Sequence, residues 1–203
     1  MCINAFESHE TILIRSGVVI LPFDSQRDDL GMITQIVRSA YSKYKDRGIY
    51  KATINQNVEE TLRRLKESGA EGMVVYSNGQ LVGTITVNLT KNIIHENLQS
   101  RFNLSGKKIL TFSQYAIDPS FQGGGIGKQV LSWVENRARS LGADYLALSS
   151  AYLAEESVQY YQNRNYSNTG ILFQRPQAEY LSLILIKRLK ASIQPSIGNA
   201  VGF

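Results

Sequence analysis

Apolar residues along the chain follow two spacings, an alternating or continuous one typical of strands and a 3.6-residue one typical of helices. Six runs rich in β-branched and aromatic residues predict strands. They cover residues 18–21, 73–76, 81–87, 108–118, 145–148 and 180–187. Between the second and third runs stands Asn78-Gly79, the strongest short signal for a β-hairpin.

Helical spacing appears in four segments, which run from 30 to about 45, from 58 to 68, from 126 to 141 and from 155 to 164. Asp28 and Asp29 are suited to cap the first of them, and Gly142 fits the position after the third. Residues 88–106 are expected to be a long connection with at most a helical turn. The order β-α-α-β-β-β-α-β-α-β predicts one α/β (α+β) domain over 18–190, between an N-terminal extension (1–17) and a mobile tail (191–203).

Composition narrows the classes of protein that fit. The 203 residues are 43% hydrophobic with a net charge of +5, which favours anionic partners only weakly. No stretch interleaves basic and aromatic residues, so no nucleic-acid partner is expected. The single cysteine, Cys2, predicts neither a disulfide nor a metal site. The N-terminus lacks the pattern of a signal peptide and no apolar run approaches a membrane span, so a cytoplasmic protein without a membrane partner is predicted.

Four of the five residues from 123 to 127 are glycines, and they stand between a predicted strand and a predicted helix. Backbone N–H groups at such a turn form an anion site that glycines leave open. The P-loop pattern fails, because Gln122 stands where glycine is required and Gln129 where Ser or Thr is required. The dinucleotide pattern G-x-G-x-x-G fails too, because its third glycine would fall on Lys128 or Val130.

The pattern Gln/Arg-x-x-Gly-x-Gly/Ala is matched in full by Gln122, Gly125 and Gly127. In this the chain resembles the GNAT superfamily of acyl-CoA N-acyltransferases, whose pyrophosphate-binding loop has this motif. A second GNAT element, Ala-x-x-x-Tyr-x-x-x-Gly-Phe, is degenerate here. Its positions are held by Ser157, Tyr161, Asn165 and Tyr166. The resemblance covers about residues 18–188 and implies a mixed central sheet flanked by helices.

The resemblance implies that acetyl-CoA is bound by the backbone at the end of the 108–118 strand and by the glycine loop. The residues so implied are Tyr115, Ala116, Ile117, Gln122, Gly123, Gly124, Gly125, Ile126, Gly127 and Lys128. Gly123 and Gly124, at variable motif positions, are expected only to loosen the turn. The backbone N–H of Ile117 is the implied donor to the thioester oxygen. Tyr161 is the candidate general acid, although Tyr160 beside it leaves the register open.

No general base is evident, because Thr111 stands where some GNAT proteins have a glutamate. His95 and Glu96 are weak candidates, and ordered water is another. Tyr41, Tyr44, Tyr50 and Tyr180 are candidates to line a substrate cleft.

The implied activity is transfer of an acetyl group from acetyl-CoA to a primary amine of a small molecule or protein, by direct attack in a ternary complex. A catalytically weak or inactive CoA-binding sensor is the alternative. A homodimer is a further possibility that the family suggests.

Overall fold

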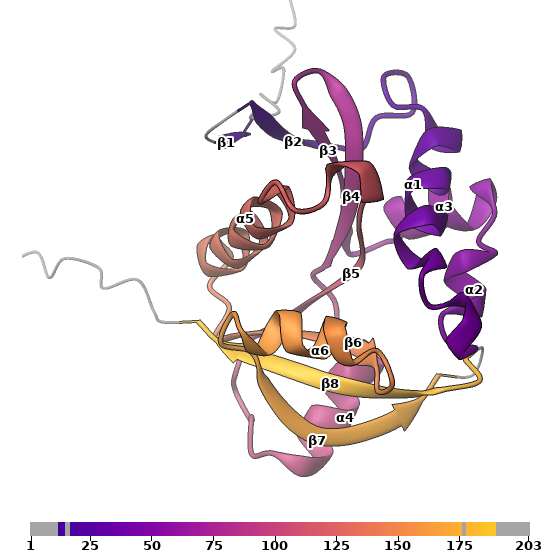
Figure 1. The fold of residues 1–203 in the computed structure, drawn as a ribbon. Coiled ribbons are helices and arrows are strands. Elements are labelled where there is room, and N and C mark those ends of the chain that lie inside the picture. The colour runs from indigo at the N-terminus through magenta and orange to yellow at the C-terminus, as the bar shows by residue number, and fades with distance from the viewer. Residues whose placement is uncertain (1–11, 15–16, 176–177, 190–203) are drawn as a thin grey trace, which may run out of the picture.

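In the computed structural model, which describes residues 12–14, 17–175 and 178–189, one sheet forms the centre of the molecule (Figure 1). Its eight strands follow the order β1-β2-β3-β4-β5-β6-β8-β7. Neighbouring strands are antiparallel except β5 and β6, which are parallel, so the sheet is mixed as expected. The strands are β1 (Ile12–Ile14), β2 (Val18–Pro22), β3 (Ala70–Ser77), β4 (Gln80–Asn88), β5 (Ile109–Ile117), β6 (Tyr145–Ala151), β7 (Ser167–Gln174) and β8 (Leu181–Arg188).

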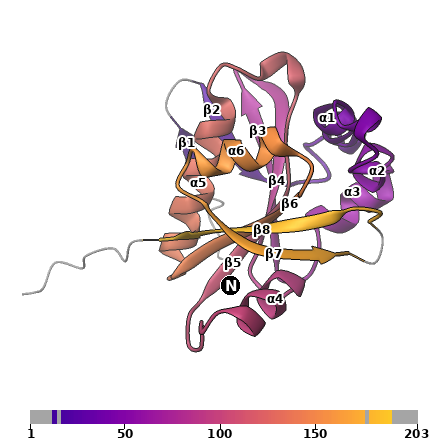
Figure 2. The ribbon, with the colours of Figure 1, turned by 60° about the horizontal axis from the view of Figure 1, so that its bottom comes forward.

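Helices cover both faces of the sheet (Figures 1 and 2). Alternation along the strands separates the two layers of core, since Leu146 packs with α5 whereas Ala147 packs with α4. One face carries α5 and α6, and the other carries α1–α3 and α4. The helices are α1 (Leu30–Ser42), α2 (Lys51–Ile54), α3 (Val58–Leu65), α4 (Ile93–Arg101), α5 (Ile126–Ser140) and α6 (Glu155–Gln162).

Several local signals act as the sequence predicts. The Asp29 carboxylate accepts the backbone N–H of Met32 at 3.0 Å and so caps α1. Asn78 and Gly79 adopt φ values of 50° and 80°, the left-handed pair that a two-residue turn between β3 and β4 requires.

The expected elements are all present, and further elements lie among them. A helix, α4, occupies much of the 88–106 segment that was expected to be a connection. The edge strand β7 pairs with β8, and the short α2 precedes α3. Residues 12–14 pair with β2, which extends the sheet into the segment assigned to an N-terminal extension. The tail at 191–203 lies outside the described residues.

The parallel pairing of β5 with β6 is short. It joins Ile109 to Tyr145, Leu110 to Leu146 and Thr111 to Ala147, and then stops, although β5 continues to residue 117 and β6 to residue 151. Beyond this point the register of β5 against β4 also shifts. The shift leaves two residues, Gln114 and Tyr115, opposite Ile85, and Gln114 takes a φ of 48°. This bulge bends β5 and separates its second half from β6.

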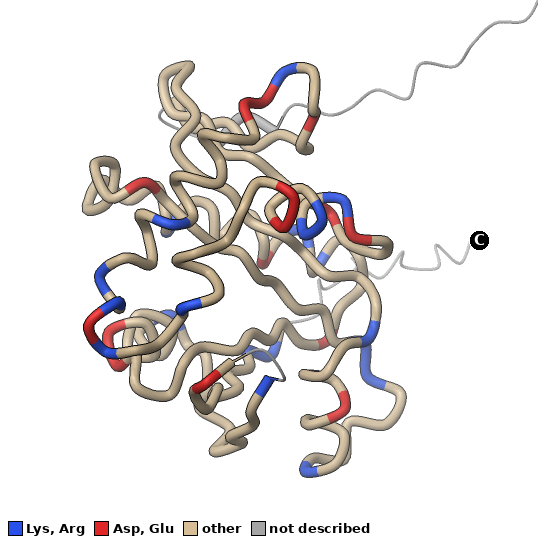
Figure 3. Tube along the Cα trace, turned by 90° about the vertical axis from the view of Figure 1, so that its right-hand side faces the viewer, with Lys and Arg blue, Asp and Glu red and all other residues tan. Residues whose placement is uncertain are grey.

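No helix within the described part of the chain is long and apolar enough to cross a membrane. On the side of the molecule formed by α1–α3, basic and acidic positions are interspersed along the trace (Figure 3).

The core position of Leu146 gives a stability prediction. Its side chain is fully buried at the centre of the sheet. Leu146→Ala should lower the free energy of unfolding by about 2–5 kcal/mol in a urea titration, because it leaves a cavity in a close-packed region. Leu172→Ala on β7, where the side chain is 41% exposed, is the matched control and should change it by about 0.5 kcal/mol or less. Equal losses in the two variants would contradict this layering of the core.

Candidate active site

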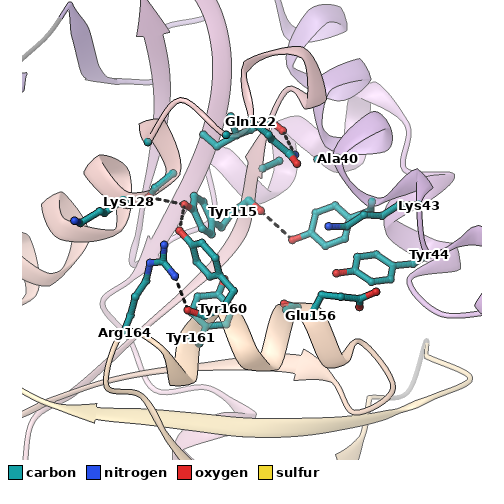
Figure 4. Close-up of a pocket in the computed structure, with 17 residues that line it drawn as sticks. Ala40, Lys43, Tyr44, Tyr115, Gln122, Lys128, Glu156, Tyr160, Tyr161 and Arg164 are labelled. Atoms are coloured by element: carbon teal, nitrogen blue, oxygen red, sulfur yellow. Dashed lines mark hydrogen bonds between the residues drawn. The ribbon is translucent and has the colours of Figure 1, made fainter.

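A cavity of about 420 Å³ opens where β5 and β6 separate (Figure 4). It is bounded by β5, by α1 on one side, and by the glycine loop, α5 and α6 on the other. The lining residues are Ala40, Tyr41, Lys43, Tyr44, Tyr115, Ala116, Ile117, Gln122, Gly123, Gly125, Gly127, Lys128, Glu156, Ser157, Tyr160, Tyr161 and Arg164. The fold therefore brings the glycine-loop motif and the tyrosine motif to one cavity.

The glycine loop reaches α5 through two residues in the left-handed region. Gly123 has a φ of 86° and Gly125, the N-cap of α5, has a φ of 82°. A Cβ at either position would meet no atom within 4 Å, so the space in front of the helix is open. The N–H groups of the first turn of α5 have no acceptor within the helix and are suited to bind an anion there. The positive φ corrects the expectation for Gly123, because the turn itself requires glycine.

Gly127 has a different role from Gly125. A Cβ on Gly127 would lie 2.7 Å from the Tyr115 hydroxyl and 3.3 Å from that of Tyr160. The Tyr115 hydroxyl donates to the Gly127 carbonyl at 2.6 Å and lies 3.1 Å from the Tyr160 hydroxyl. Gly127 therefore permits close packing of two tyrosines against the start of α5, which fixes the loop to β5.

Two polar side chains implied for phosphate binding have other orientations. Gln122 donates its Nε2 to the Ile117 carbonyl at 2.9 Å, which ties the loop back to β5. The ammonium group of Lys128 points away from the centre of the cavity (Figure 4). Arg164, a residue that the motifs do not include, lines the cavity instead. Its guanidinium lies 3.6 Å from the centroid of the Tyr160 ring and donates to the Tyr160 carbonyl at 2.7 Å.

The backbone N–H of Ile117 on β5 has no acceptor among the residues that the structure describes. Asp118 donates its N–H to the Val82 carbonyl at 2.8 Å, which makes these residues a hydrogen-bonded pair of the antiparallel ladder. The next pair, Ile117 with Gly83, is therefore of the non-hydrogen-bonded kind, and its N–H points away from β4. The N–H therefore points toward the gap that opens where β6 no longer pairs with β5. The carbonyl of Tyr115 is already occupied, because the Tyr41 hydroxyl donates to it at 3.0 Å.

Tyr161 lies at the cavity with its ring buried. The ring packs 6.0 Å from that of Phe112 and 5.6 Å from that of Tyr166, measured between centroids. Burial raises the pKa of Tyr161 well above its ordinary value, so the phenol is neutral at physiological pH. Its hydroxyl makes no hydrogen bond within the described part of the chain, whereas that of Tyr160 is engaged by Tyr115. Tyr161 is thus the one of the two tyrosines with a free hydroxyl.

The degenerate positions of the tyrosine motif fit the backbone that they occupy. Asn165, which stands at the motif glycine, has a φ of 65°, in the left-handed region that asparagine tolerates. Tyr166, at the phenylalanine position, is buried beside Tyr161. Its hydroxyl donates to Glu135 Oε1 at 3.3 Å, which satisfies the extra polar atom.

The structure places both candidate bases outside the cavity lining. His95 is 5% exposed, accepts the Asn92 N–H on Nδ1 at 3.0 Å and contacts the Ile109 carbonyl through Nε2 at 2.8 Å. It therefore caps α4 and has no access to the cavity. Glu96 is exposed on α4 and is also absent from the lining. Thr111 accepts the side-chain amide of Asn92 at 2.7 Å.

One carboxylate, that of Glu156, lines the cavity among the described residues. Arg47 donates to it at 2.9 Å, and this hydrogen bond lowers its pKa to about 2. A carboxylate with so low a pKa is a poor base at neutral pH.

The four tyrosines expected at a cleft do lie together. The ring of Tyr50 lies 4.9 Å from Tyr41, 5.1 Å from Tyr44 and 5.3 Å from Tyr180. Tyr41 and Tyr44 line the cavity, and burial raises the pKa of Tyr44 to about 12. Tyr50 accepts the N–H of Ala151 at 2.8 Å and holds the end of β6.

A search of protein families finds that residues 30–166 match the model of the acetyltransferase (GNAT) family. The chain belongs to the GNAT family of acetyltransferases. Among curated proteins, this GNAT chain is similar to an aminoalkylphosphonate N-acetyltransferase of Salmonella typhimurium, with 26% identity over 96 residues. The match covers 47% of this chain and 56% of that protein, so the chain spans about half the length of this relative.

Solved structures show the same fold. A ribosomal L7/L12 α-N-protein acetyltransferase in complex with coenzyme A superposes with a TM-score of 0.65 at 14% identity, covering 90% of this chain and all of that one (100%). A PaiA N-acetyltransferase from Thermoplasma acidophilum, also in complex with coenzyme A, gives 0.61 at 12% identity, with 84% and 98% covered. The ribosomal-protein-S18-alanine N-acetyltransferase of Escherichia coli gives 0.59 at 11% identity, with 92% and 99% covered.

The open space at Gly125 generates a binding prediction. Gly125→Val should weaken CoA binding at least about 100-fold in titration calorimetry, because a branched side chain would fill the space in front of the α5 N-terminus. Gly142→Val is the matched control, since Gly142 also has a positive φ, of 73°, with no atom within 4 Å of its Cβ. It lies outside the cavity lining and should keep CoA affinity. Unchanged affinity in a folded Gly125→Val protein would remove the loop assignment.

Proposed function

We propose that this GNAT protein transfers an acetyl group from acetyl-CoA to the primary amine of a small molecule or protein, by direct attack in a ternary complex. The observation that carries the proposal is the open N-terminal end of α5 beside the unpaired edge of β5 at one cavity. The two features suit the two parts of CoA, since a helix N-terminus binds a pyrophosphate and a strand edge binds an amide-containing arm. The names of the relatives support an amine acceptor.

The residues of the cavity suit the proposed binding of acetyl-CoA. Backbone N–H groups from Gly123 to Lys128 would hold the pyrophosphate, with Gly124 and Ile126 contributing main chain only. Arg164 and Lys43 add positive charge to the lining. The backbone of Tyr115, Ala116 and Ile117 would align the amide-containing arm along β5.

The proposed transfer step uses two donors, the backbone N–H of Ile117 at the end of β5 and the hydroxyl of Tyr161 on α6. The N–H of Ile117 would donate to the thioester oxygen as negative charge develops there. The amine nitrogen forms the new bond to the carbonyl carbon, the C–S bond breaks, and the Tyr161 hydroxyl donates its proton to the departing thiolate. Water is the proposed acceptor of the proton that the amine loses, because the lining carboxylate of Glu156 is held by Arg47.

Thioester consumption measured with a panel of primary amines tests this function against the CoA-binding alternative. The proposal requires that at least one amine accelerates CoA release. If CoA binds and no amine accelerates CoA release, the protein is a CoA-binding sensor and the proposed enzymatic activity is wrong. The cytoplasmic location stays a prediction from the sequence, and the homodimer stays a possibility that the family suggests.

The role of Tyr161 gives a kinetic prediction. Tyr161→Phe should lower kcat about 100-fold, the usual scale of general acid catalysis, while CoA affinity stays the same. Tyr145→Phe, a partly buried tyrosine on β6 outside the cavity lining, is the matched control and should keep kcat. A full kcat in Tyr161→Phe together with its loss in Tyr160→Phe would assign the acid to Tyr160.

A further inference from the structure

Arg175, directly after β7, is a partly buried arginine whose guanidinium has no acidic partner among the described residues. Its Nη2 donates to the Ser149 hydroxyl at 2.9 Å, and its Cζ lies 5.6 Å from the centroid of the Phe173 ring. These are the contacts that the described residues make with its charged group, and neither carries a negative charge. Burial lowers the pKa of Arg175, and the positive charge of Arg64 acts in the same direction.

Four other arginines of the described chain differ from Arg175 in this respect, whereas Arg38 and Arg164 bond only to backbone carbonyls. Arg27, Arg47, Arg63 and Arg64 each have a carboxylate within 2.9 Å, from Asp28, Glu156 or Glu60. Removing a cation from water without a counter-charge is unfavourable, so an unpaired buried guanidinium is suited to receive an anion. Its planar fork matches the oxygens of a carboxylate, phosphonate or phosphate.

The position of Arg175 relates it to the opening between β5 and β6. Ser149 lies two residues beyond Ala147, where β6 last pairs with β5, and the two share the sheet face that carries α4 and α1–α3. Figure 1 shows this end of β7 on the same side of the molecule as α2. Arg175 thus lies on one face of the sheet. The N-terminus of α5, where the CoA pyrophosphate is proposed to bind, lies on the other face.

A row of aromatic rings connects this region to the cavity. Tyr180 lies 5.3 Å from Tyr50, which lies 4.9 Å from Tyr41, between ring centroids. Tyr41 lines the cavity and bonds to β5 at Tyr115. The charges of Arg175 and Arg64 both act on the Tyr180 hydroxyl, which places the two cations near the same ring.

A second polar group on this face lacks a partner. Gln114 is 6% exposed, and its side-chain Nε2 donates no hydrogen bond within the described chain, although its Oε1 accepts from Gln56 at 3.3 Å. The positive φ of Gln114 directs this donor to the α1–α3 face of β5. Gln114 is therefore a buried, unsatisfied donor on the same face of the sheet as Ser149.

We propose that Arg175, with the Ser149 hydroxyl beside it, binds an acidic group on the acceptor, so that the substrate is a small amine that also carries a carboxylate, phosphonate or phosphate. This inference rests on the proposed function, because it names the substrate class for the same site. The acidic group lies at Arg175 and the amine reaches the thioester at Ile117. Polyamines are disfavoured, because the charge of Arg175 has no acidic partner among the described residues and repels a second positive charge.

The test compares matched amines with the wild-type protein. β-Alanine is paired with 3-aminopropanol, 2-aminoethylphosphonate is paired with ethanolamine, and putrescine represents cationic amines. At least one acidic amine should show a kcat/KM about 10- to 100-fold above its neutral partner, the factor expected for charged hydrogen bonds. Calorimetry on CoA-saturated protein should show the same order of binding, and this readout does not depend on turnover.

Arg175→Gln should raise KM or Kd for the acidic amine about 10- to 100-fold. The kcat for this amine, the affinity for CoA and the kcat/KM for the neutral amine should change little. Arg175→Lys, which keeps the charge but loses the fork, should regain part of the affinity. Arg188→Gln is the matched control, an exposed arginine at the opposite end of β8 from Tyr180, and should change nothing.

Three results would overturn the inference: a preference for neutral or cationic amines, an Arg175→Gln protein that binds acidic amines as tightly as wild type, or no binding of either acidic amine to the CoA-loaded protein. A preference for an acidic peptide over both small acids would also overturn the small-molecule assignment. Failure of the proposed function looks different. In that case CoA does not bind, or no amine is acetylated, while an acidic amine still binds in an Arg175-dependent way.

Discussion

The short pairing between β5 and β6 is the feature on which the cavity and its residues depend. Three residue pairs join the strands before the bulge at Gln114 and Tyr115 bends β5 away. Buried backbone groups need partners, so the exposed edge must be satisfied by side chains or by a bound molecule. Side chains of Tyr41 and Gln122 occupy the carbonyls of Tyr115 and Ile117. The Ile117 N–H, directed away from β4, has no hydrogen-bond partner among the described residues and is the donor proposed to meet the ligand.

Tyrosines supply most of the polar chemistry around this edge. Burial raises the pKa of four phenols that line the cavity, those of Tyr41, Tyr44, Tyr115 and Tyr161. Tyr115 fixes the position of the glycine loop, because its hydroxyl bonds to both the Tyr160 hydroxyl and the Gly127 carbonyl. Tyr161 lies beside Tyr160, and its hydroxyl makes no hydrogen bond within the described residues, so a neutral phenol is available there. The proposed mechanism therefore uses backbone donors and a phenol, because the lining carboxylate found among the described residues, Glu156, is paired with Arg47.

Features encoded within a few residues could be predicted from the sequence, such as the Asn78-Gly79 turn, the Asp29 cap and the glycine loop. The helix α4 could not, because its buried positions Ile94 and Leu98 stand among polar residues and pack against distant strands. His95, a weak candidate base in the sequence, is buried and contacts the carbonyl of Ile109, fourteen positions away. Arg164 and Arg175 gave no local signal, since their roles depend on neighbours that only the fold brings together.

The central claim is that the edge of β5 at Ile117 is open and receives CoA. Amide hydrogen exchange, measured residue by residue with and without CoA, tests it most directly, because it reports on this backbone edge. Without CoA, the Ile117 N–H should exchange faster than that of Asp118, which is bonded to Val82. Saturation with CoA should slow exchange at Ile117 and from Gly123 to Lys128, and leave Leu146, at the paired end of β6, unchanged. Equal protection of Ile117 and Asp118 in the free protein, with no change at Ile117 when CoA binds, would contradict the account.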